Sequence, residues 1–549
     1  MKKANGEMKK SVLLTSVCQP FGEKHGDSFG VSYEGTHQVL WAQGIFRPRS
    51  TTTQWGIDFI AVNLDTPTVT LHYPSMKQFI KEIKKGYDYI GIAFVVPTFH
   101  KIKPMVEAIR RYAPNTKIVL GGYGTIIPKE DLAPYSDHIC CGEGVAFMRK
   151  LLGESAVTTY QQPLIVKQSY LYSLPILARV GYVFAGLGCP NGCDFCVTSH
   201  YFKRKHIKLL PTGESIMKAI QDLQRKRPDV NSIWISDEEF LIDHKRARDF
   251  LAAVRTIDKI PSLSIFASMR ALSRFTVEEI VEMGIDWIWI GFEGKKAGYS
   301  KMEGGSFKEK FSELKSHGIN VMASMILGFD YQTAQVVQEE FDELMSYNPT
   351  SCQFLIYGPA LCTPAYEKYK REKRLLDMDY RYQDGFNCGI SHPHINPEEM
   401  SKLQRSLYHQ EYRKLGPSVY RTISDWHSGH MTLKNHPNPK IRAKGEFLGE
   451  KSHNALAAFP VFAKFYKENP DVLKEIDSLS ENIENSTGGL CFKDRVFAKL
   501  FPLAAWFTDF RLKHDLFQQP KLLRHVYRGE GKSKCQSTST MPQRWGTVG

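Results

Sequence analysis

Several features that would mark other classes of protein are scarce in this sequence of 549 residues. No run of about 18 apolar residues occurs, so no transmembrane helix is predicted. The apolar stretch after the basic N-terminus, residues 12–18, is too short for a secretory signal peptide and predicts a first strand. The 11 cysteines are few and odd in number, and only one group is regularly spaced. A secreted disulfide framework is therefore disfavoured, and a reducing cytoplasm with a metal site is favoured.

Positive charge is in excess. Lys and Arg number 72 against 58 Asp and Glu, a formal net charge of +14, and basic runs occur at 203–205 and 521–528. Such runs are usually solvated surface, with an anionic substrate, a membrane surface or nucleic acid as alternatives. Because no basic motif interleaved with aromatics supports nucleic-acid binding, no nucleic-acid partner is expected.

Residues 1–152 alternate short apolar segments with amphipathic ones. Strands are predicted at 12–17, 59–62, 89–94, 117–120 and 138–140, and the clearest helix at 102–112. This alternation is typical of a doubly wound parallel sheet, a Rossmann-like domain. The stretch 19–53 lacks such periodicity and is predicted to be a functional loop or an insertion.

The rest of the chain predicts an α/β fold that gives way to helices. A linker is expected over 153–180 and a second α/β series over 181–390, with strands at 182–184, 232–235, 264–267, 287–290, 321–326 and 353–356. Six strand–helix repeats predict a complete or partial (β/α)6 barrel. Residues 391–528 are predicted to be a mainly helical region, and the polar tail 529–549 to be disordered.

The regularly spaced cysteines are Cys189, Cys193 and Cys196, which directly follow the first barrel strand. Thiolates are the normal ligands of iron–sulfur clusters, and three of them leave one iron of a [4Fe–4S] cluster open to another ligand. The alternative is structural zinc, with His200 or His206 as fourth ligand. The spacing favours the cluster, because zinc fingers and ribbons pair a CxxC with a distant second pair.

This CxxxCxxC motif, with the aromatic Phe195 before its last cysteine, resembles that of the radical S-adenosylmethionine (SAM) superfamily. The resemblance extends over about residues 180–375, through segments at the ends of the later predicted strands. It implies a [4Fe–4S] cluster on the three cysteines, SAM at the open iron, and cleavage of SAM to methionine and a 5′-deoxyadenosyl radical. The electron would come from a donor such as flavodoxin or ferredoxin.

The same resemblance implies a set of SAM contacts at the barrel rim. These are Phe195, Asp237, Arg270, Glu293 and Ser324. From the residue types alone, the charged members could equally form ordinary salt bridges. Within 358–364, Cys362 stands where the family usually has glycine.

Glycine-rich segments end two strands of the N-terminal unit, where parallel sheets bind ligands. Residues 121–125 and 142–144 resemble motifs of the cobalamin-binding domain that precedes many radical SAM enzymes, although Thr125 comes one position early. The implied cobalamin contacts are Thr98, Gly121, Gly122, Tyr123, Gly142, Glu143 and Gly144. Because the Asp-x-His-x-x-Gly signature is absent, the alternative of a degenerate domain that binds no cofactor stays open.

The domain pair predicts a radical SAM enzyme that uses cobalamin to methylate an unactivated carbon of a small molecule, a C-methyltransferase. One alternative is a radical SAM enzyme of this architecture that closes a ring or rearranges a lipid or tetrapyrrole. The other is a zinc-stabilised binding protein without catalysis.

The C-terminal third is rich in aromatic residues interleaved with Lys and Arg. They are Phe459, Phe462, Phe465, Tyr466, Phe497, Phe501, Trp506, Phe507 and Phe510. A helical core is predicted; the alternative is a basic, apolar face that meets a membrane and admits a lipid-like substrate. The predicted location is the cytoplasm, with peripheral membrane association as the alternative.

Overall fold

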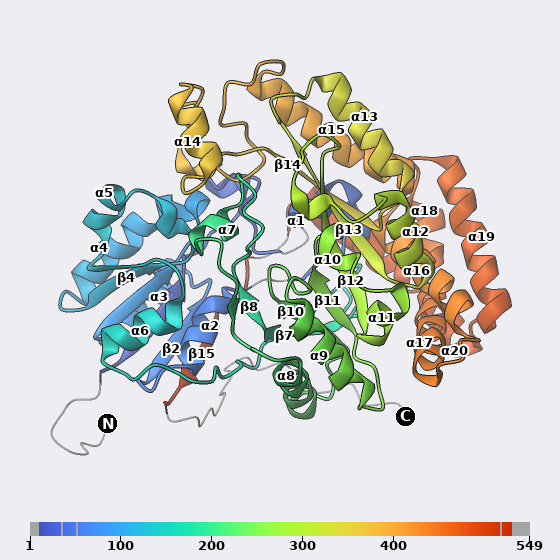
Figure 1. Ribbon diagram of the computed structural model, residues 1–549, viewed down its shortest axis with the longest axis horizontal. Coiled ribbons are helices and arrows are strands. Elements are labelled where there is room, and N and C mark those ends of the chain that lie inside the picture. Colours follow the sequence, from blue (N-terminus) through green and yellow to red (C-terminus); the bar gives the residue numbers. More distant parts are fainter. Residues whose placement is uncertain (1–9, 35–36, 51–52, 517–518, 530–549) are drawn as a thin grey trace. The chain divides into compact units, whose positions relative to one another are not determined.

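The computed structural model describes residues 10–34, 37–50, 53–516 and 519–529 (Figure 1). The chain divides into two compact units. The first comprises Met1–Tyr33, Thr53–Pro163 and Gln519–Gly549, and the second comprises Glu34–Thr52 and Leu164–Gln518. The predicted disordered tail, 529–549, lies outside the described residues except for Gly529.

The first unit is an α/β sheet domain. Its strands are β1 (Val12–Ser16), β2 (Thr68–His72), β3 (Tyr89–Ala93), β4 (Lys117–Gly121), β5 (His138–Cys140) and β15 (Leu523–Tyr527). Its helices are η1 (Glu23–His25), α2 (Trp55–Val62), α3 (Met76–Ile83), η3 (Val96–Lys101), α4 (Ile102–Tyr112), η4 (Tyr123–Ile126), α5 (Lys129–Leu132), η5 (Ala133–Tyr135) and α6 (Gly144–Leu152).

The strand order confirms the predicted doubly wound sheet. Strands run β2-β1-β3-β4-β5, all parallel, and β15 joins antiparallel outside β2. This is the flavodoxin-like order, in which ligands bind beyond the carboxyl ends of the strands. Every residue of β1 is buried, as expected for a central strand covered on both faces.

One predicted strand is wrong. Residues 59–62 form the last half of helix α2, and the strand of this region is β2, six residues farther on. A short apolar run fits a buried helix as well as a strand. Strand β2 carries threonines and a histidine whose side chains are buried, so it lacks the apolar pattern that identifies a core strand.

The predicted helical region 391–528 also ends in a strand. Residues Leu523–Tyr527 form β15, which pairs with β2 between residues more than 440 positions apart in the sequence. On β15, Arg524 donates to both carboxylate oxygens of Glu82 on α3, at 2.8 and 3.0 Å. The C-terminal end of the chain is thus tied to the N-terminal sheet by main-chain and side-chain contacts.

This ion pair predicts acid sensitivity of the first unit. Burial would raise the pKa of Glu82, but hydrogen bonds from Arg524, Lys85 and Tyr87 lower it to about 2, from an ordinary 4.5. The stabilisation is complete above pH 4.5 and is lost as the pH falls towards 2. We expect Glu82→Gln to lower the free energy of unfolding by about 1–2 kcal/mol at neutral pH and by much less near pH 3, measured by urea unfolding. An equal loss at both pH values would contradict this account.

The second unit contains the barrel strands and most of the helices. Its strands are β6 (Val166–Gln168), β7 (Arg179–Phe184), β8 (Gly186–Leu187), β9 (Ile207–Lys208), β10 (Ser232–Ser236), β11 (Leu263–Phe266), β12 (Ile285–Glu293), β13 (Asn320–Leu327) and β14 (Ser351–Ile356). Its first helices are α1 (His37–Leu40), η2 (Trp41–Phe46), α7 (Val197–Tyr201), α8 (Gly213–Lys226), α9 (His244–Arg255), α10 (Met269–Leu272), α11 (Val277–Glu282), η6 (Ser300–Met302), α12 (Phe307–Ser316), α13 (Ala334–Ser346) and α14 (Pro364–Arg371). The later ones are η7 (Tyr380–Tyr382), α15 (Pro397–Leu415), α16 (Ser418–Leu433), α17 (Pro439–Ala455), η8 (Leu456–Ala458), α18 (Phe459–Phe465), α19 (Pro470–Thr487), α20 (Phe492–Ala498) and α21 (Phe501–Lys513).

The barrel is partial, which is one of the two forms that the sequence left open. Six parallel strands follow one another in chain order from β7 through β10, β11, β12 and β13 to β14. The predicted linker is not free of structure, because β6 within it pairs antiparallel with β7 at one edge of the sheet. Parallel strands bring their carboxyl ends to one rim, so the segments after β8, β10, β11, β12, β13 and β14 can contribute to one site.

The C-terminal helices form a core of their own, to which Ile45 and Phe46 of η2 also belong. Phe46 of η2 stacks on Phe462 at a centroid distance of 5.2 Å. The irregular stretch 19–53 therefore contains a packing insertion into the second unit. Among the aromatic residues predicted to form a helical core, four are buried: Phe459, Phe462, Tyr466 and Phe501.

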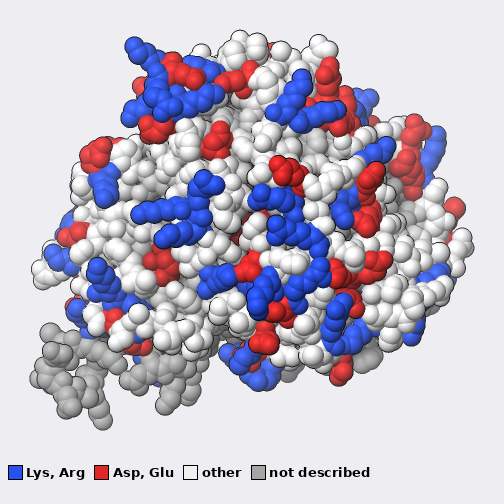
Figure 2. Space-filling model, in the orientation of Figure 1, with Lys and Arg blue, Asp and Glu red and all other residues white. Residues whose placement is uncertain are grey.

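The remaining aromatics divide differently. Phe465 packs against this core while partly exposed, but Trp506, Phe507 and Phe510 of α21 are 58%, 52% and 41% exposed. The side chain of Phe497 lies outside the described residues. Among helices of the described part of the chain, none is long and apolar enough to cross a membrane. On the face drawn in Figure 2, Lys and Arg are interspersed with Asp and Glu instead of forming one unbroken basic surface.

Candidate functional site

The three cysteines lie on the loop between β8 and α7, beyond the first barrel strand. Gly188 opens this loop with φ +76°, and a Cβ there would come within 2.4 Å of the Lys205 carbonyl oxygen, so only glycine fits. The amide of Cys196 donates to the Cys193 carbonyl at 3.0 Å and closes a tight turn. The loop therefore folds locally, as its sequence predicts.

The thiols of the loop share one buried environment. Cys189 and Cys193 are buried and Cys196 is half-buried. Burial raises the pKa of Cys189 to about 12 and of Cys193 to about 11, and neighbouring thiols contribute to the rise. Three thiolates together here need a compensating positive charge, which bound iron supplies.

The geometry disfavours zinc. The Nε2 atom of His200 lies 3.0 Å from the Cys193 carbonyl oxygen, and that of His206 lies 3.1 Å from Asp237, so both candidate fourth ligands are engaged elsewhere. Tetrahedral zinc places sulfur ligands about 3.8 Å apart. Among the described residues, three ligand atoms come within 4.8 Å of one another only at Asp58, His72 and His525, and the cysteines are spaced more widely. A larger group with separate irons fits this donor set.

Side chains that follow strands β10 and β11 hold the cysteine loop through Asn191. Glu239 accepts from the Asn191 amide at 2.9 Å and from the Ser268 backbone N–H at 2.7 Å. Arg270 donates to the Asn191 oxygen at 2.7 Å. Arg270 therefore lies at the predicted rim and contacts the loop. Glu239 was missed by sequence reasoning, although it stands two residues after the chosen Asp237.

Asp237 is in a different setting from the one predicted. Its carboxylate is completely buried, accepts from Arg246 at 2.6 Å, and lies 3.1 and 3.2 Å from the His206 ring nitrogen. Burial would raise the pKa of Asp237, but hydrogen bonds and charge interactions with His206 and Arg246 lower it. Both carboxylate oxygens of Asp237 already contact Arg246 or His206, so the residue forms an ion pair within the barrel.

Glu293 ends β12 beside the cysteine loop. It is buried, has φ +60°, and forms an ion pair with Lys301. The Lys301 ammonium also lies 5.6 Å from the centroid of the Phe195 ring. Burial alone would lower the pKa of Lys301, but Glu293 and the nearby Cys193 thiol raise it. The left-handed backbone of Glu293 and the partly buried Lys301 make this rim position a candidate for function.

Aromatic side chains line the other side of the loop. The Phe195 ring meets Tyr299 and Tyr357 edge-on at 5.4 and 6.0 Å. Both tyrosine hydroxyls donate to Asp194, at 2.6 and 3.3 Å. Sequence reasoning missed these residues, because Lys301 lies in the short helix η6 and the tyrosines lie outside helices and strands, where no motif marks them.

Ser324 lies on β13 inside the barrel. Its hydroxyl accepts from the Trp289 indole and donates to Gln353 at 3.0 Å. The structure thus brings Phe195, Arg270 and Glu293 to the cysteine loop, and places Ser324 and Asp237 in polar contacts of the barrel itself.

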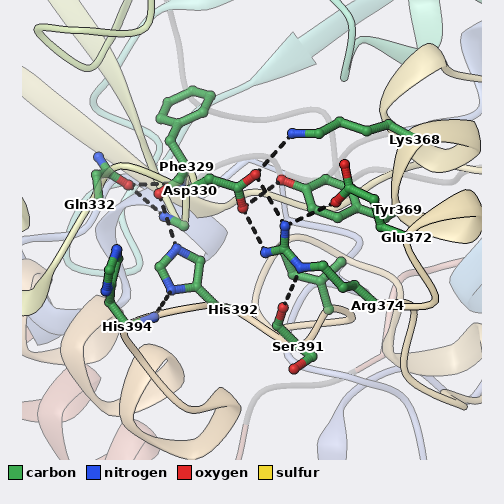
Figure 3. Close-up of polar contacts among 12 residues, drawn as sticks. Phe329, Asp330, Gln332, Lys368, Tyr369, Glu372, Arg374, Ser391, His392 and His394 are labelled. Atoms are coloured by element: carbon green, nitrogen blue, oxygen red, sulfur yellow. Dashed lines mark hydrogen bonds and ion pairs between the residues drawn. The ribbon is translucent and has the colours of Figure 1, made fainter.

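A polar cluster around Asp330 fixes helix α14 (Figure 3). Asp330 follows β13 and accepts from Lys368 at 2.9 Å, Tyr369 at 3.1 Å and Arg374 at 2.6 Å. These donors lie on α14 and just after it. At the start of α14, the Ala365 N–H donates to the Asp194 carbonyl of the cysteine loop at 3.1 Å. The cluster therefore supports the loop through α14.

A second branch of this cluster contains His392. Its Nε2 atom lies 3.0 Å from the Phe329 carbonyl oxygen, and its Nδ1 accepts from the backbone N–H groups of His394 and Ile395 (Figure 3). This arrangement assigns the neutral tautomer with the proton on Nε2. Burial lowers the pKa of His392, which favours the same form.

We expect Asp330→Asn to loosen the cysteine loop. Because the Asp330 side chain is 34% exposed, the free energy of unfolding should fall by only about 1 kcal/mol. The rate at which a chelator removes iron, followed by loss of visible absorbance, should rise several-fold. Asp342→Asn, which breaks an exposed pair with Lys414, is the matched control. Equal iron loss in both variants would contradict support through α14.

The predicted cobalamin contacts gather at the carboxyl ends of β3, β4 and β5. Gly122 has φ +89°, and a Cβ there would meet the Phe94 carbonyl oxygen at 2.7 Å. Gly142 has φ +94° with nothing within 4 Å of a Cβ, so the backbone there is open. Gly121 ends β4, and Tyr123 begins η4. Exposed backbone at this edge can accept a large ligand.

The other residues of this set, Thr98, Glu143 and Gly144, make contacts within the first unit. The Thr98 hydroxyl donates to the Val95 carbonyl at 2.9 Å and accepts from the Val95 N–H at 3.1 Å. Glu143 caps α6 by accepting two backbone N–H groups at 2.7 Å each. Gly144 lets α6 approach α2, where a Cβ would meet Ile60 at 2.5 Å. These three residues shape the edge without presenting a free polar group to it.

Comparison with known proteins identifies the domain that contains the cysteines. Residues 183–345 match the Radical SAM superfamily. This segment, which contains the three cysteines, is identified as a radical SAM domain. Its sequence is 22% identical over 366 residues to the anaerobic magnesium-protoporphyrin IX monomethyl ester cyclase of Rubrivivax gelatinosus, covering 58% of this chain and 64% of the relative. It is 26% identical over 254 residues to the bacteriochlorophyllide d C-12(1)-methyltransferase of Chlorobaculum tepidum, covering 44% and 53%. The chain spans less than two thirds of the length of these curated relatives.

Solved radical SAM structures share the fold. The methyltransferase TsrM from Kitasatospora setae, with cobalamin and a [4Fe-4S] cluster bound, has a TM-score of 0.54 at 13% identity, over 82% of this chain and all of TsrM. The cobalamin-dependent radical enzyme OxsB has a TM-score of 0.50 at 15% identity, over 93% of this chain and 81% of OxsB. At such identities the likeness is one of fold.

Proposed function

We propose that this radical SAM protein uses a [4Fe–4S] cluster, SAM and cobalamin to methylate an unactivated carbon of a small molecule. The observation that carries the proposal is the cysteine loop, which places three thiols at the barrel rim. Among the described residues, no fourth side chain joins these thiols in a set with the spacing of a metal site. Support for cobalamin comes from the flavodoxin-like first unit and from the folds of TsrM and OxsB.

In this proposal, Cys189, Cys193 and Cys196 hold the cluster, which supplies one-electron cleavage of SAM to methionine and a 5′-deoxyadenosyl radical. Lys301 and Arg270 place positive charge beside the loop, suited to a carboxylate. Glu293 offers a carboxylate to an ammonium or ribose hydroxyl. Phe195 and the tyrosines around it exclude water from the reacting atoms.

In the first unit, Gly122 and Gly142 would let cobalamin approach the backbone, and the cofactor would supply the methyl group. Each turnover would consume two SAM molecules, one cleaved to 5′-deoxyadenosine and methionine and one demethylated to S-adenosylhomocysteine. An electron donor such as flavodoxin or ferredoxin would supply the electrons.

The test uses SAM labelled with deuterium in its methyl group. Cobalamin-loaded protein, a reductant and a lipid and metabolite extract are combined without oxygen, and products are examined by mass spectrometry. The proposal expects a labelled product together with 5′-deoxyadenosine and S-adenosylhomocysteine. Deoxyadenosine without any labelled product would contradict methylation.

That contrary outcome would favour the second candidate, a ring-closing or rearranging enzyme. The 22% identity to the Rubrivivax gelatinosus cyclase supports this candidate. It predicts products without an added methyl group, and a tetrapyrrole or a lipid would then be the class of substrate to examine first.

An exposed apolar face supports a lipid-like substrate. On α20 and α21, large apolar side chains are exposed, among them Phe492 at 83%, Leu503 at 62% and Trp506 at 58%. Arg495 and Lys513 are exposed on the same helices, and Lys499 is exposed between them. An apolar face flanked by positive charge is typical of peripheral attachment to anionic membranes.

We expect the protein to sediment with anionic phospholipid vesicles. Since burying each large apolar side chain contributes about 1.5–3 kcal/mol, the double variant Trp506→Ser and Phe507→Ser should bind at least about ten-fold more weakly. Leu376→Ser removes an apolar side chain of 40% exposure in another segment and is the matched control. Equal vesicle binding by all three proteins, or none by the wild type, would contradict membrane attachment.

A further inference from the structure

We infer that Asp58, His72 and His525 form a site for a divalent transition-metal ion in the first unit. The three side chains come from α2, the last position of β2, and β15. The Nε2 atom of His72 lies 2.8 Å from one carboxylate oxygen of Asp58, and the Nδ1 atom of His525 lies 3.1 Å from the other. One ligand atom from each residue lies within 4.8 Å of the other two.

The imidazole of His72 contacts the Asp58 carboxylate through Nε2, and its Nδ1 atom has no hydrogen-bond partner among the described residues. The residue is completely buried, and neither ring nitrogen has an aligned hydrogen bond, despite the short approach to Asp58. A buried polar group left in this way is unfavourable. Ligand atoms around one metal ion at 2.0–2.1 Å lie about 3 Å apart without being aligned as donor and acceptor. Bound metal would therefore satisfy the His72 ring in the observed arrangement.

The carboxylate of Asp58 is oriented as a metal ligand usually is. The Thr70 hydroxyl donates to it at 2.7 Å and the Tyr527 hydroxyl at 3.0 Å. The group is thus fixed by outer hydrogen bonds, which orient ligating carboxylates in metalloproteins.

The donor set indicates the class of metal. Two imidazoles and one carboxylate suit Zn²⁺, Fe²⁺ or Co²⁺, whereas Ca²⁺ and Mg²⁺ prefer oxygen ligands alone. The His525 side chain is 20% exposed, which gives the ion a way in. Metal bound here would fasten β15 to β2 and so join the C-terminal strand to the N-terminal sheet.

Zinc binding to the full chain tests the site. After reconstitution of the iron–sulfur cluster and removal of loose metal, zinc is titrated against a chromogenic chelator and measured separately from iron by mass spectrometry. One zinc ion per chain is expected, bound about 100-fold more weakly by His525→Ala. His138→Ala, a change on β5 of the same sheet, should bind as the wild type does. Equal zinc affinity in the wild type and His525→Ala would overturn the site, as would no zinc retained by the wild type.

A second measurement distinguishes loss of the zinc site from misfolding of the variant. Strand β15 keeps its Arg524–Glu82 ion pair in His525→Ala, so the variant should fold. Saturating zinc should raise the unfolding temperature of the wild type and of His138→Ala, and leave that of His525→Ala unchanged. His525→Gln should behave as His525→Ala does. An equal rise in all four proteins would assign zinc to another site and overturn the inference.

Discussion

Cys196→Ala should abolish both the iron–sulfur cluster and the formation of 5′-deoxyadenosine. Two remaining thiolates cannot hold a [4Fe–4S] cluster in the arrangement that leaves one iron open, so iron should fall from about four atoms per chain to near zero. Deoxyadenosine formation should fall by at least about a hundred-fold, since no other group in the barrel supplies the electron. Iron, acid-labile sulfide and deoxyadenosine are measured on the same anaerobic preparations.

Cys362→Ala is the sharpest control for this prediction. Cys362 lies in the segment after β14, half-buried, and interacts electrostatically with Cys196. If the open iron is free of protein ligands, Cys362→Ala keeps its cluster and its activity. Loss of the cluster in this variant would make Cys362 a fourth ligand and would contradict an open iron.

Asp237→Asn should produce the largest loss of stability among single changes in the barrel. The variant leaves the completely buried Arg246 without its carboxylate, and removing one partner of a buried ion pair typically costs about 3–5 kcal/mol. The loss is measured as the free energy of unfolding in urea. In the variant that remains folded, the Michaelis constant for SAM should change little, because Asp237 is bonded within the barrel.

Asp222→Asn is the matched control for stability. Asp222 forms ion pairs with Lys218 and Arg225 on the exposed face of α8, where such pairs contribute less than about 1 kcal/mol. A normal free energy of unfolding for Asp237→Asn, combined with a large rise in the Michaelis constant for SAM, would show that the carboxylate contacts SAM after all.

The elements that sequence predicted best are those encoded locally. The strands with Ile and Val runs, such as β3 and β4, stand where their patterns indicate, and the cysteine loop depends on the spacing of three residues and one glycine. Strand β2 was missed because Thr68, Thr70 and His72 are polar, and only tertiary packing buries them. Strand β15 was missed because its partner lies at the other end of the chain.

The residues of the site also differ in how well the sequence predicted them. Arg270 and Glu293 lie beside the cysteine loop, as family motifs imply, whereas Asp237 carries the motif but faces Arg246. Lys301 and Glu239 could not be chosen from sequence, because a lysine in a single helical turn or a glutamate after a strand has no local signature. Their importance comes from burial and from the partners that folding brings to them.

The account rests on an open iron that binds SAM, and Mössbauer spectroscopy tests this most directly. Protein reconstituted with ⁵⁷Fe is compared before and after addition of SAM. The account predicts that one of about four irons changes its spectrum while the other three keep theirs. Spectra that are identical with and without SAM, or the absence of a four-iron cluster in the wild-type protein, would contradict it.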